Sequence, residues 1–180
     1  SSAASDVYKR QRLGYGLAAP DNDLTLPEIA ALCDVFYIGG TKVGALFGEA
    51  VVIKNPELAQ DFRYLIKQNG GMLAKGRLLG LQFDALFTDG LYQEISAHAI
   101  AMAEKLREAF TAKGYTYLAP NRTNQIFVIV PDAHLAKISE QFEYSYDQRI
   151  DATHSCVRFC TGWATREENV DALIRCVEKM

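Results

Sequence analysis

This chain of 180 residues contains one long stripe of apolar residues at helical spacing, and the sequence before the stripe differs in pattern from the sequence after it. Apolar residues recur at helical spacing from Leu91 to Ala109, and Gly114 then supplies a C-terminal stop. The sequence before the stripe has too few strands for a sheet of its own, whereas the sequence after it alternates short strands with short helices. We therefore expect the closing part of a larger domain at residues 12–90, a connecting helix at 91–113 and a small α+β domain at 114–180.

The composition is that of a folded protein and excludes several partner classes. The hydrophobic fraction is 49%, the charged fraction is 23% and the formal net charge is −3, so neither disorder nor a basic nucleic-acid surface is indicated. No apolar run reaches the roughly 18 residues of a membrane span, and the start lacks a signal-peptide pattern. We expect a cytoplasmic protein with no nucleic-acid or membrane partner.

The cysteines and histidines do not suggest a metal centre. The four cysteines form no CxxC pair, and the three histidines show no ligand spacing with carboxylates. Cys156 and Cys160 lie four residues apart in an apolar stretch, which would place them on the same face of a strand. We expect buried, reduced thiols and no bound metal.

Residues 1–11 differ in character from the rest of the chain. They are polar, small and aperiodic, and they run into Arg12 without a helix or strand start signal. We expect this segment to be foreign to the natural sequence and to form no part of the fold.

Local signals predict the order of the elements before the stripe. Thr25 and Glu28 form a capping box with Pro27 between them, which opens a helix through about Cys33. A strand should follow at 34–38, two strand segments at 45–54, a helix capped by Asn55 to about Gln68, and a further helix at 72–87. After the stripe, Thr165 and Glu168 form a second capping box before the last helix.

Lys42 lies directly after the apolar run 34–38, within the turn Gly39-Gly40-Thr41-Lys42-Val43-Gly44. Glycine has no Cβ, so a backbone of this kind can approach a planar ligand closely. A lysine amine that loses its proton on burial can attack a carbonyl carbon to form a Schiff base. A solvated loop lysine is the alternative, and the residues by themselves leave both open.

Arg158 interrupts an apolar strand, where an unpaired charge is costly. Its planar guanidinium is suited to bind a carboxylate through two parallel hydrogen bonds. A structural salt bridge to Asp151 or Glu168 explains the same position equally well.

Four segments taken together resemble one enzyme family. They read RLGYGL at 12–17, DVFYIGGTKVG at 34–44, NGGMLAKG at 69–76 and VRFCT at 157–161. In this order they are similar to the low-specificity threonine aldolases, which belong to the β-eliminating lyase branch of the aspartate aminotransferase-like pyridoxal phosphate enzymes. The resemblance covers roughly the last half of such an enzyme.

This resemblance implies a fold and a set of site residues. The fold would be α/β: the C-terminal portion of an aspartate aminotransferase-like fold, with the end of the cofactor-binding large domain followed by an α+β small domain. Lys42 would be the Schiff-base lysine of pyridoxal 5'-phosphate, with Thr41 beside it, and Arg158 would hold the substrate α-carboxylate. Arg12 would close the family's Asp-x-Ala-Arg segment, whose aspartate falls within residues 1–11.

The glycine-rich segment at 69–76 resembles one that reaches the neighbouring subunit's cofactor phosphate in this family. Leu73 stands where many members have arginine, which leaves Lys75 or Arg77 as substitutes. The resemblance thus implies a homodimer or homotetramer with its active site at the subunit interface.

The implied reaction is cleavage of the Cα–Cβ bond of β-hydroxy-α-amino acids, which converts threonine to glycine and acetaldehyde, and we expect the 180 residues alone to be inactive. One alternative is a related β-eliminating lyase that acts on C–S or similar bonds, with Lys42 removing the Cα proton. Another is a non-catalytic fragment or pseudoenzyme that serves subunit packing.

Overall fold

The computed structural model describes residues 11–180, which form two compact units. Unit 1 holds the described residues up to Leu17 together with Asn22–Ile95, and unit 2 holds Ala18–Asp21 and Ser96–Met180. The expectation about residues 1–11 falls, apart from Gln11, outside the described residues. No helix within residues 11–180 is long and apolar enough to cross a bilayer.

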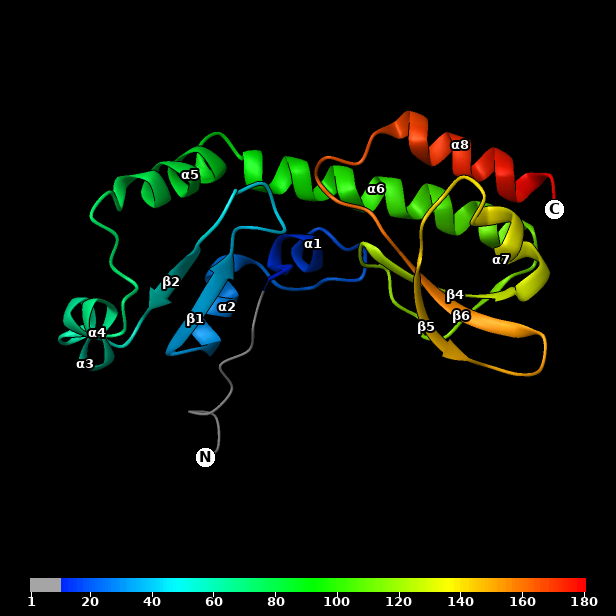
Figure 1. The fold of residues 1–180 in the computed structure, drawn as a ribbon. Coiled ribbons are helices and arrows are strands. Elements are labelled where there is room, and N and C mark those ends of the chain that lie inside the picture. The colour runs from blue at the N-terminus through cyan, green and yellow to red at the C-terminus, as the bar shows by residue number, and fades with distance from the viewer. Residues whose placement is uncertain (1–10) are drawn as a thin grey trace. The chain divides into compact units, whose positions relative to one another are not determined.

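Unit 1 is built from short helices around a two-stranded antiparallel ribbon (Figure 1). In the ribbon, β1 (Val35–Gly39) pairs with β2 (Glu49–Ile53), in a register that runs from Val35 opposite Ile53 to Gly39 opposite Glu49. Its helices are α1 (Leu13–Leu17), α2 (Leu26–Leu32), α3 (Pro56–Ala59), α4 (Phe62–Gln68), α5 (Arg77–Phe87) and the start of α6 (Leu91–Ala112).

The first capping box forms as predicted. The Thr25 side chain accepts a hydrogen bond from the Glu28 backbone N–H, and the Glu28 carboxylate accepts one from the Thr25 N–H at 2.7 Å. The Thr25 hydroxyl also donates to this carboxylate at 2.7 Å, and this bond, followed by that from the Thr25 N–H, lowers the pKa of Glu28. Two donors at the start of α2 are therefore satisfied, and strand β1 follows after the helix ends.

Three predicted boundaries in unit 1 are wrong. The helix expected from Asn55 to Gln68 is two helices, because Asp61 takes a left-handed backbone conformation with φ of 57° between α3 and α4. Only one strand forms in the range 45–54. The helix expected at 72–87 begins at Arg77, since Gly70 has a φ of 74° and the next residues are not helical.

The long helix is confirmed as α6. It ends just before Gly114, whose φ of 79° is a backbone conformation that favours glycine. The Gly114 and Tyr115 N–H groups donate to the carbonyls of Thr111 and Phe110 at 2.9 and 3.0 Å. These carbonyls at the end of the helix are thereby satisfied, and the chain turns toward the strand at Thr116–Tyr117.

Unit 2 contains a four-stranded antiparallel sheet in the order β3-β4-β6-β5. Its strands are β3 (Thr116–Tyr117), β4 (Gln125–Pro131), β5 (Ser145–Arg149) and β6 (His154–Cys160), and its further helices are α7 (Asp132–Ile138) and α8 (Glu167–Glu178).

One face of this sheet carries the core. Alternate residues of β4 and β6, among them Val128 and Val157, join buried side chains of α6, α7 and α8 in one hydrophobic cluster. Phe110 of α6 belongs to this cluster and is fully buried, with its ring centroid 5.4 Å from that of Phe159. Because side chains alternate along a strand, Arg158 projects from the opposite face of the sheet, away from this core.

Two expectations in unit 2 need correction. The Thr165 hydroxyl accepts a hydrogen bond from the Gly162 N–H at 2.8 Å, so it caps a turn, and α8 begins after Arg166 without a side-chain cap. Cys156 is buried as predicted, but Cys160, the last residue of β6, is exposed on the same face of the sheet as Arg158.

Candidate active site

Lys42 lies at the surface of a tight turn that follows β1. The Gly40 carbonyl accepts hydrogen bonds from Val43 N–H at 2.9 Å and Ala45 N–H at 3.0 Å, which closes the turn. Val43 is fully buried and anchors the turn, whereas Thr41 and Lys42 are both exposed. The turn therefore presents the amine of Lys42 at the end of a strand on a fixed backbone.

A buried tyrosine supports the Lys42 backbone from the neighbouring helix. The hydroxyl of Tyr15 donates to the Lys42 carbonyl at 2.5 Å, and the Tyr15 side chain is 1% exposed. Tyr15 belongs to α1, which directly follows Arg12, a half-buried residue whose carbonyl accepts from Gly16 N–H at 3.1 Å. Two of the four motif segments, at 12–17 and 34–44, are thus joined by a hydrogen bond.

The glycines of the turn are required by protein packing. A Cβ on Gly40 would lie 2.7 Å from the Ala45 Cβ and 2.9 Å from the Phe83 ring. Gly44 has a φ of 97°, and a Cβ there would lie 2.8 Å from Ile95. At these two positions the close approach is made by the protein itself, which differs from the expectation that a ligand takes this space.

The glycine-rich segment lines a positively charged cavity in unit 1. The cavity has a volume of about 820 Å³, and its charged lining residues are Arg63, Lys67 and Arg77, with no carboxylate among the described residues that line it. Leu73 also lines it, but Lys75, although exposed, does not. Of the two cations that the sequence left as candidates, Arg77 lines this cavity and Lys75 does not.

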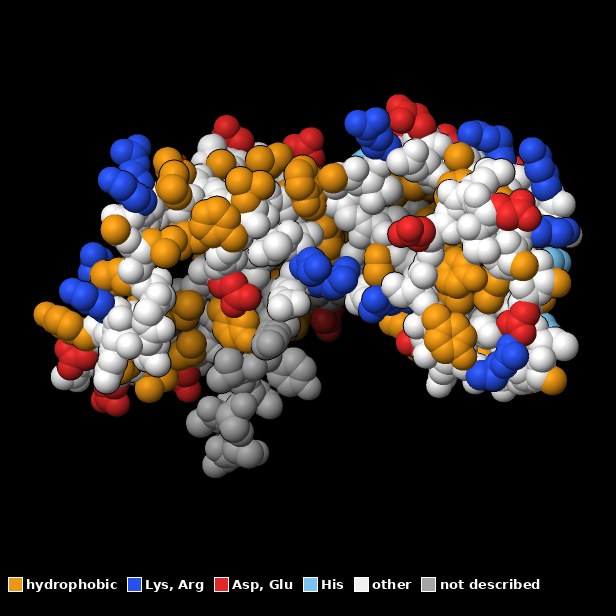
Figure 2. Space-filling model, in the orientation of Figure 1, with side chains coloured by type: hydrophobic (Ala, Val, Ile, Leu, Met, Phe, Trp, Pro, Cys, Tyr) orange, Lys and Arg blue, Asp and Glu red, His pale blue; other side chains and the backbone are white. Residues whose placement is uncertain are grey.

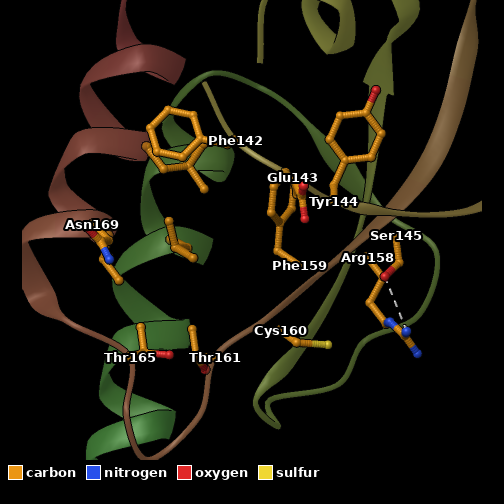
Figure 3. Close-up of a pocket in the computed structure, with 13 residues that line it drawn as sticks. Phe142, Glu143, Tyr144, Ser145, Arg158, Phe159, Cys160, Thr161, Thr165 and Asn169 are labelled. Atoms are coloured by element: carbon orange, nitrogen blue, oxygen red, sulfur yellow. Dashed lines mark hydrogen bonds between the residues drawn. The ribbon is translucent and has the colours of Figure 1, made fainter. Parts of the chain in front are cut away.

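Arg158 has neutral partners on unit 2. Its Nη1 donates to the Gln125 side-chain oxygen and its Nη2 to the Ser145 hydroxyl, each at 3.4 Å. The residue is half-buried and lines a cavity of about 400 Å³. Figure 3 shows Arg158 and Ser145 on one side of this cavity, with Phe142 and Asn169 on the other.

The salt bridge from Arg158 to Asp151 or Glu168 does not form among the described residues. Asp151 instead accepts hydrogen bonds from the Thr153 N–H at 2.7 Å and from the ring of His154 at 3.0 Å. These contacts, that of the Thr153 backbone first, lower the pKa of the Asp151 carboxyl to about 2. Arg158 is therefore left without a carboxylate partner in this part of the chain.

Sequence reasoning missed the residues that support the candidate groups. Arg63 and Lys67 are four residues apart on α4, so their helical spacing could have placed them on one face. Tyr15 is separated from Lys42 by 27 residues, and Gln125 from Arg158 by 33. No local pattern connects residues at such separations, because the tertiary fold brings them together.

Comparison with known proteins gives consistent matches to one family. The low specificity L-threonine aldolase of a Pseudomonas species is 30% identical over 78% of this chain and 40% of its own length. The solved threonine aldolase of Leishmania major is 39% identical over 94% of this chain and 49% of its own, with a TM-score of 0.90. A structure from Listeria monocytogenes described as an L-allo-threonine aldolase shares the fold at 21% identity and a TM-score of 0.68.

No protein-family model matches the chain. The chain spans about 40% of the length of the curated relatives that it matches. Both curated relatives and the Leishmania major structure carry the threonine aldolase name. The chain therefore belongs to the threonine aldolase family and has the α/β architecture of the aspartate aminotransferase-like fold.

Proposed function

We propose that the protein carrying this chain is a pyridoxal phosphate-dependent lyase that cleaves the Cα–Cβ bond of β-hydroxy-α-amino acids, converting threonine to glycine and acetaldehyde. The observation that carries the proposal is the exposed Lys42 on its braced turn after β1, in a chain 39% identical to the Leishmania threonine aldolase. A primary amine is the group that binds a carbonyl cofactor covalently.

The residues of unit 1 fit pyridoxal phosphate. Lys42 would bind the carbonyl carbon of the cofactor, and Thr41 and Arg12 would contribute to the same cofactor site. The cations around the glycine-rich segment suit a phosphate group, with Arg77 favoured and Lys75 as the second candidate. When bound, the cofactor supplies the electron sink that takes up the electron pair released from the Cα–Cβ bond.

Arg158 would bind the substrate α-carboxylate. A carboxylate held by a guanidinium fixes the orientation of the substrate Cα, and that orientation decides which of the bonds to Cα breaks. The absence of a carboxylate partner for Arg158 within the described residues supports this role, since the charge is not used by a structural ion pair.

The assembly and location also form part of the proposal. The glycine-rich segment would complete the cofactor site of a second subunit, in a homodimer or homotetramer. The cytoplasmic location expected from the sequence stays a prediction.

The test is an assay of the full-length protein that contains this sequence, supplied with pyridoxal phosphate. We expect acetaldehyde release from threonine, detected by coupling to alcohol dehydrogenase, and loss of that activity in Lys42→Ala but not in Lys54→Ala, an exposed lysine at the end of β2. Release of sulfide and pyruvate from cysteine without threonine cleavage would instead support the β-eliminating alternative. No lyase activity with either amino acid would contradict the proposal.

The 180 residues by themselves are proposed to be inactive, because they span about 40% of the curated relatives. Borohydride reduction after addition of pyridoxal phosphate should leave no stable adduct on Lys42 in the chain alone and a Lys42 adduct in the full-length protein. Peptide mass spectrometry distinguishes the two results. An adduct on the chain alone would show that its cofactor site is self-sufficient.

A further inference from the structure

The guanidinium of Arg158 is held by two uncharged side chains. Gln125 and Ser145 each accept one hydrogen bond from it at 3.4 Å, one on each terminal nitrogen. A guanidinium has five N–H donors, so these two contacts leave others for a ligand. Glu143, although it lines the same cavity, forms no ion pair with Arg158 in the described part of the chain.

The sheet register explains why these two residues reach Arg158. Ser145 on β5 lies directly opposite Arg158 on β6. On the other side of β6, Phe127 of β4 is the direct partner of Arg158, and Gln125 precedes Phe127 by two residues on the same face. Arg158 therefore lies between two strands, and each contributes one polar neighbour.

The strand ends beside Gln125 are fixed by buried hydrogen bonds. Asn124 is 1% exposed, and its side-chain N–H donates to the Thr161 carbonyl at 2.5 Å. The Thr161 N–H donates back to the Asn124 carbonyl at 3.0 Å, and the Thr161 hydroxyl donates to the Ala99 carbonyl of α6 at 2.6 Å. The start of β4, the end of β6 and α6 are thereby locked together, which sets the position of Gln125 relative to Arg158.

We propose that Gln125 and Ser145 are positioning residues that orient the Arg158 guanidinium while leaving its charge free for a substrate carboxylate. This inference rests on the proposed function, in which Arg158 binds the α-carboxylate. The chemical identity of the two neighbours carries the argument. A carboxylate in either place would pair with Arg158 and compete with the substrate, whereas an amide and a hydroxyl fix the geometry without neutralising the charge.

The first experiment tests the contact without any need for activity. Phenylglyoxal reacts with the neutral form of an arginine side chain, and a carboxylate beside Arg158 stabilises the protonated form. The rate of modification at Arg158 is followed by peptide mass spectrometry in the 180-residue chain and in its Gln125→Glu and Ser145→Asp variants. Gln141→Glu is the matched control, because Gln141 lines a different cavity with Lys137 and Arg175.

We expect Gln125→Glu and Ser145→Asp to slow the modification of Arg158 about fivefold, and Gln141→Glu to leave it unchanged. Circular dichroism of each variant establishes that it is folded, and Gln125→Met, which removes the amide without adding charge, is the second variant if Gln125→Glu does not fold. We expect Gln125→Met to change the rate as well. Rates that match the unmodified sequence in all folded variants would overturn the proposed contact.

The second experiment separates this inference from the proposed function. In the full-length protein, Gln125→Glu should raise KM for threonine about fivefold with kcat nearly unchanged, because the introduced carboxylate competes with substrate binding. Ser145→Ala should raise KM less, and Ser145→Thr should restore it. If the modification rates respond as expected but Arg158→Gln leaves KM unchanged, the carboxylate role of Arg158 is wrong and the contact is right. If Arg158→Gln raises KM and Gln125→Glu does not, the positioning role is wrong.

Discussion

The hydroxyl of Tyr15 donates a hydrogen bond of 2.5 Å to the backbone carbonyl of Lys42, which lies 27 residues further along the chain. The bond links α1 to the turn after β1, so the residue proposed to bind the cofactor is supported through its backbone while its amine stays exposed. A support of this kind restricts the position of the amine without competing for it.

Replacing Tyr15 by phenylalanine should lower the free energy of unfolding by about 1–2 kcal/mol, because the Lys42 carbonyl loses its donor while the ring remains in place. Urea denaturation measures the change. Tyr64→Phe is the control, since Tyr64 is 74% exposed on α4 and should unfold as the original chain does. Equal midpoints for the two variants would show that the Tyr15 hydroxyl contributes nothing.

Gly40→Ala should destabilise unit 1 by about 1–3 kcal/mol, because the new Cβ would lie 2.7 Å from Ala45 and 2.9 Å from Phe83. Gly80→Ala is the control, and its change in stability should have the opposite sign. Gly80 lies within α5 and has no atom within 4 Å of its would-be Cβ, so alanine should stabilise by about 0.5–1 kcal/mol. Thermal unfolding of both variants is the measurement, and a neutral Gly40→Ala would contradict the packing described for this turn.

Thr161→Val should cost about 1–2 kcal/mol of stability in unit 2. Valine keeps the shape of threonine, but the buried hydrogen bond of 2.6 Å to the Ala99 carbonyl is lost. Thr116→Val makes the same chemical change at an exposed position on β3 and should be close to neutral. Hydrogen exchange of the β4 and β6 amides should accelerate in the first variant and stay constant in the second.

Stability should fall above pH 10 because of Tyr92. Burial raises the pKa of this phenol to about 12, although a hydrogen bond with the Gly14 backbone lowers it in part. Between pH 10 and 12 the unfolded chain loses the phenolic proton more readily than the folded chain, so the fold loses up to ~2–3 kcal/mol over this window and nothing below it. Urea denaturation at pH 9 and pH 11.5 compares the two conditions, and Tyr92→Phe should remove this part of the pH dependence while Tyr64→Phe keeps it.

Arg77→Gln should weaken binding of pyridoxal phosphate by the full-length protein about five- to tenfold, because the proposed phosphate site loses a guanidinium. Lys75→Gln should have a smaller effect, since Lys75 does not line the positively charged cavity. Cofactor fluorescence gives both dissociation constants. The reverse order of effects would assign the phosphate contact to Lys75.

The two capping boxes show where local sequence is sufficient and where it is not. Both have threonine followed three residues later by glutamate, and at Thr25 the predicted reciprocal hydrogen bonds form. At Thr165 the hydroxyl accepts from the Gly162 N–H three residues earlier, so a competing local turn replaces the helix cap. Gly114, by contrast, follows the end of α6 as predicted, with a φ of 79° and its N–H bonded to the Thr111 carbonyl.

The residues of the candidate site also differ in whether the local sequence could predict them. Lys42 and Arg158 could be singled out from their unusual chemical settings in the sequence, a lysine among glycines and an arginine in an apolar strand. Tyr15, Gln125 and Ser145 could not, because the position of a hydroxyl or amide in the sequence does not indicate its distant partner. Their roles depend on strand register and helix placement, which arise only when the chain is folded.

The β1–β2 ribbon has a practical consequence for work on the chain alone. Each of its strands has one edge without a strand partner within residues 11–180, and Val35 and Val51 are 39% and 45% exposed on it. Figure 2 shows further hydrophobic side chains over α5, where Leu78 and Leu81 are about half exposed. Unpaired edges of this kind template intermolecular pairing, so the isolated chain should aggregate with rising concentration, and a lysine placed at Val51 should improve its solubility.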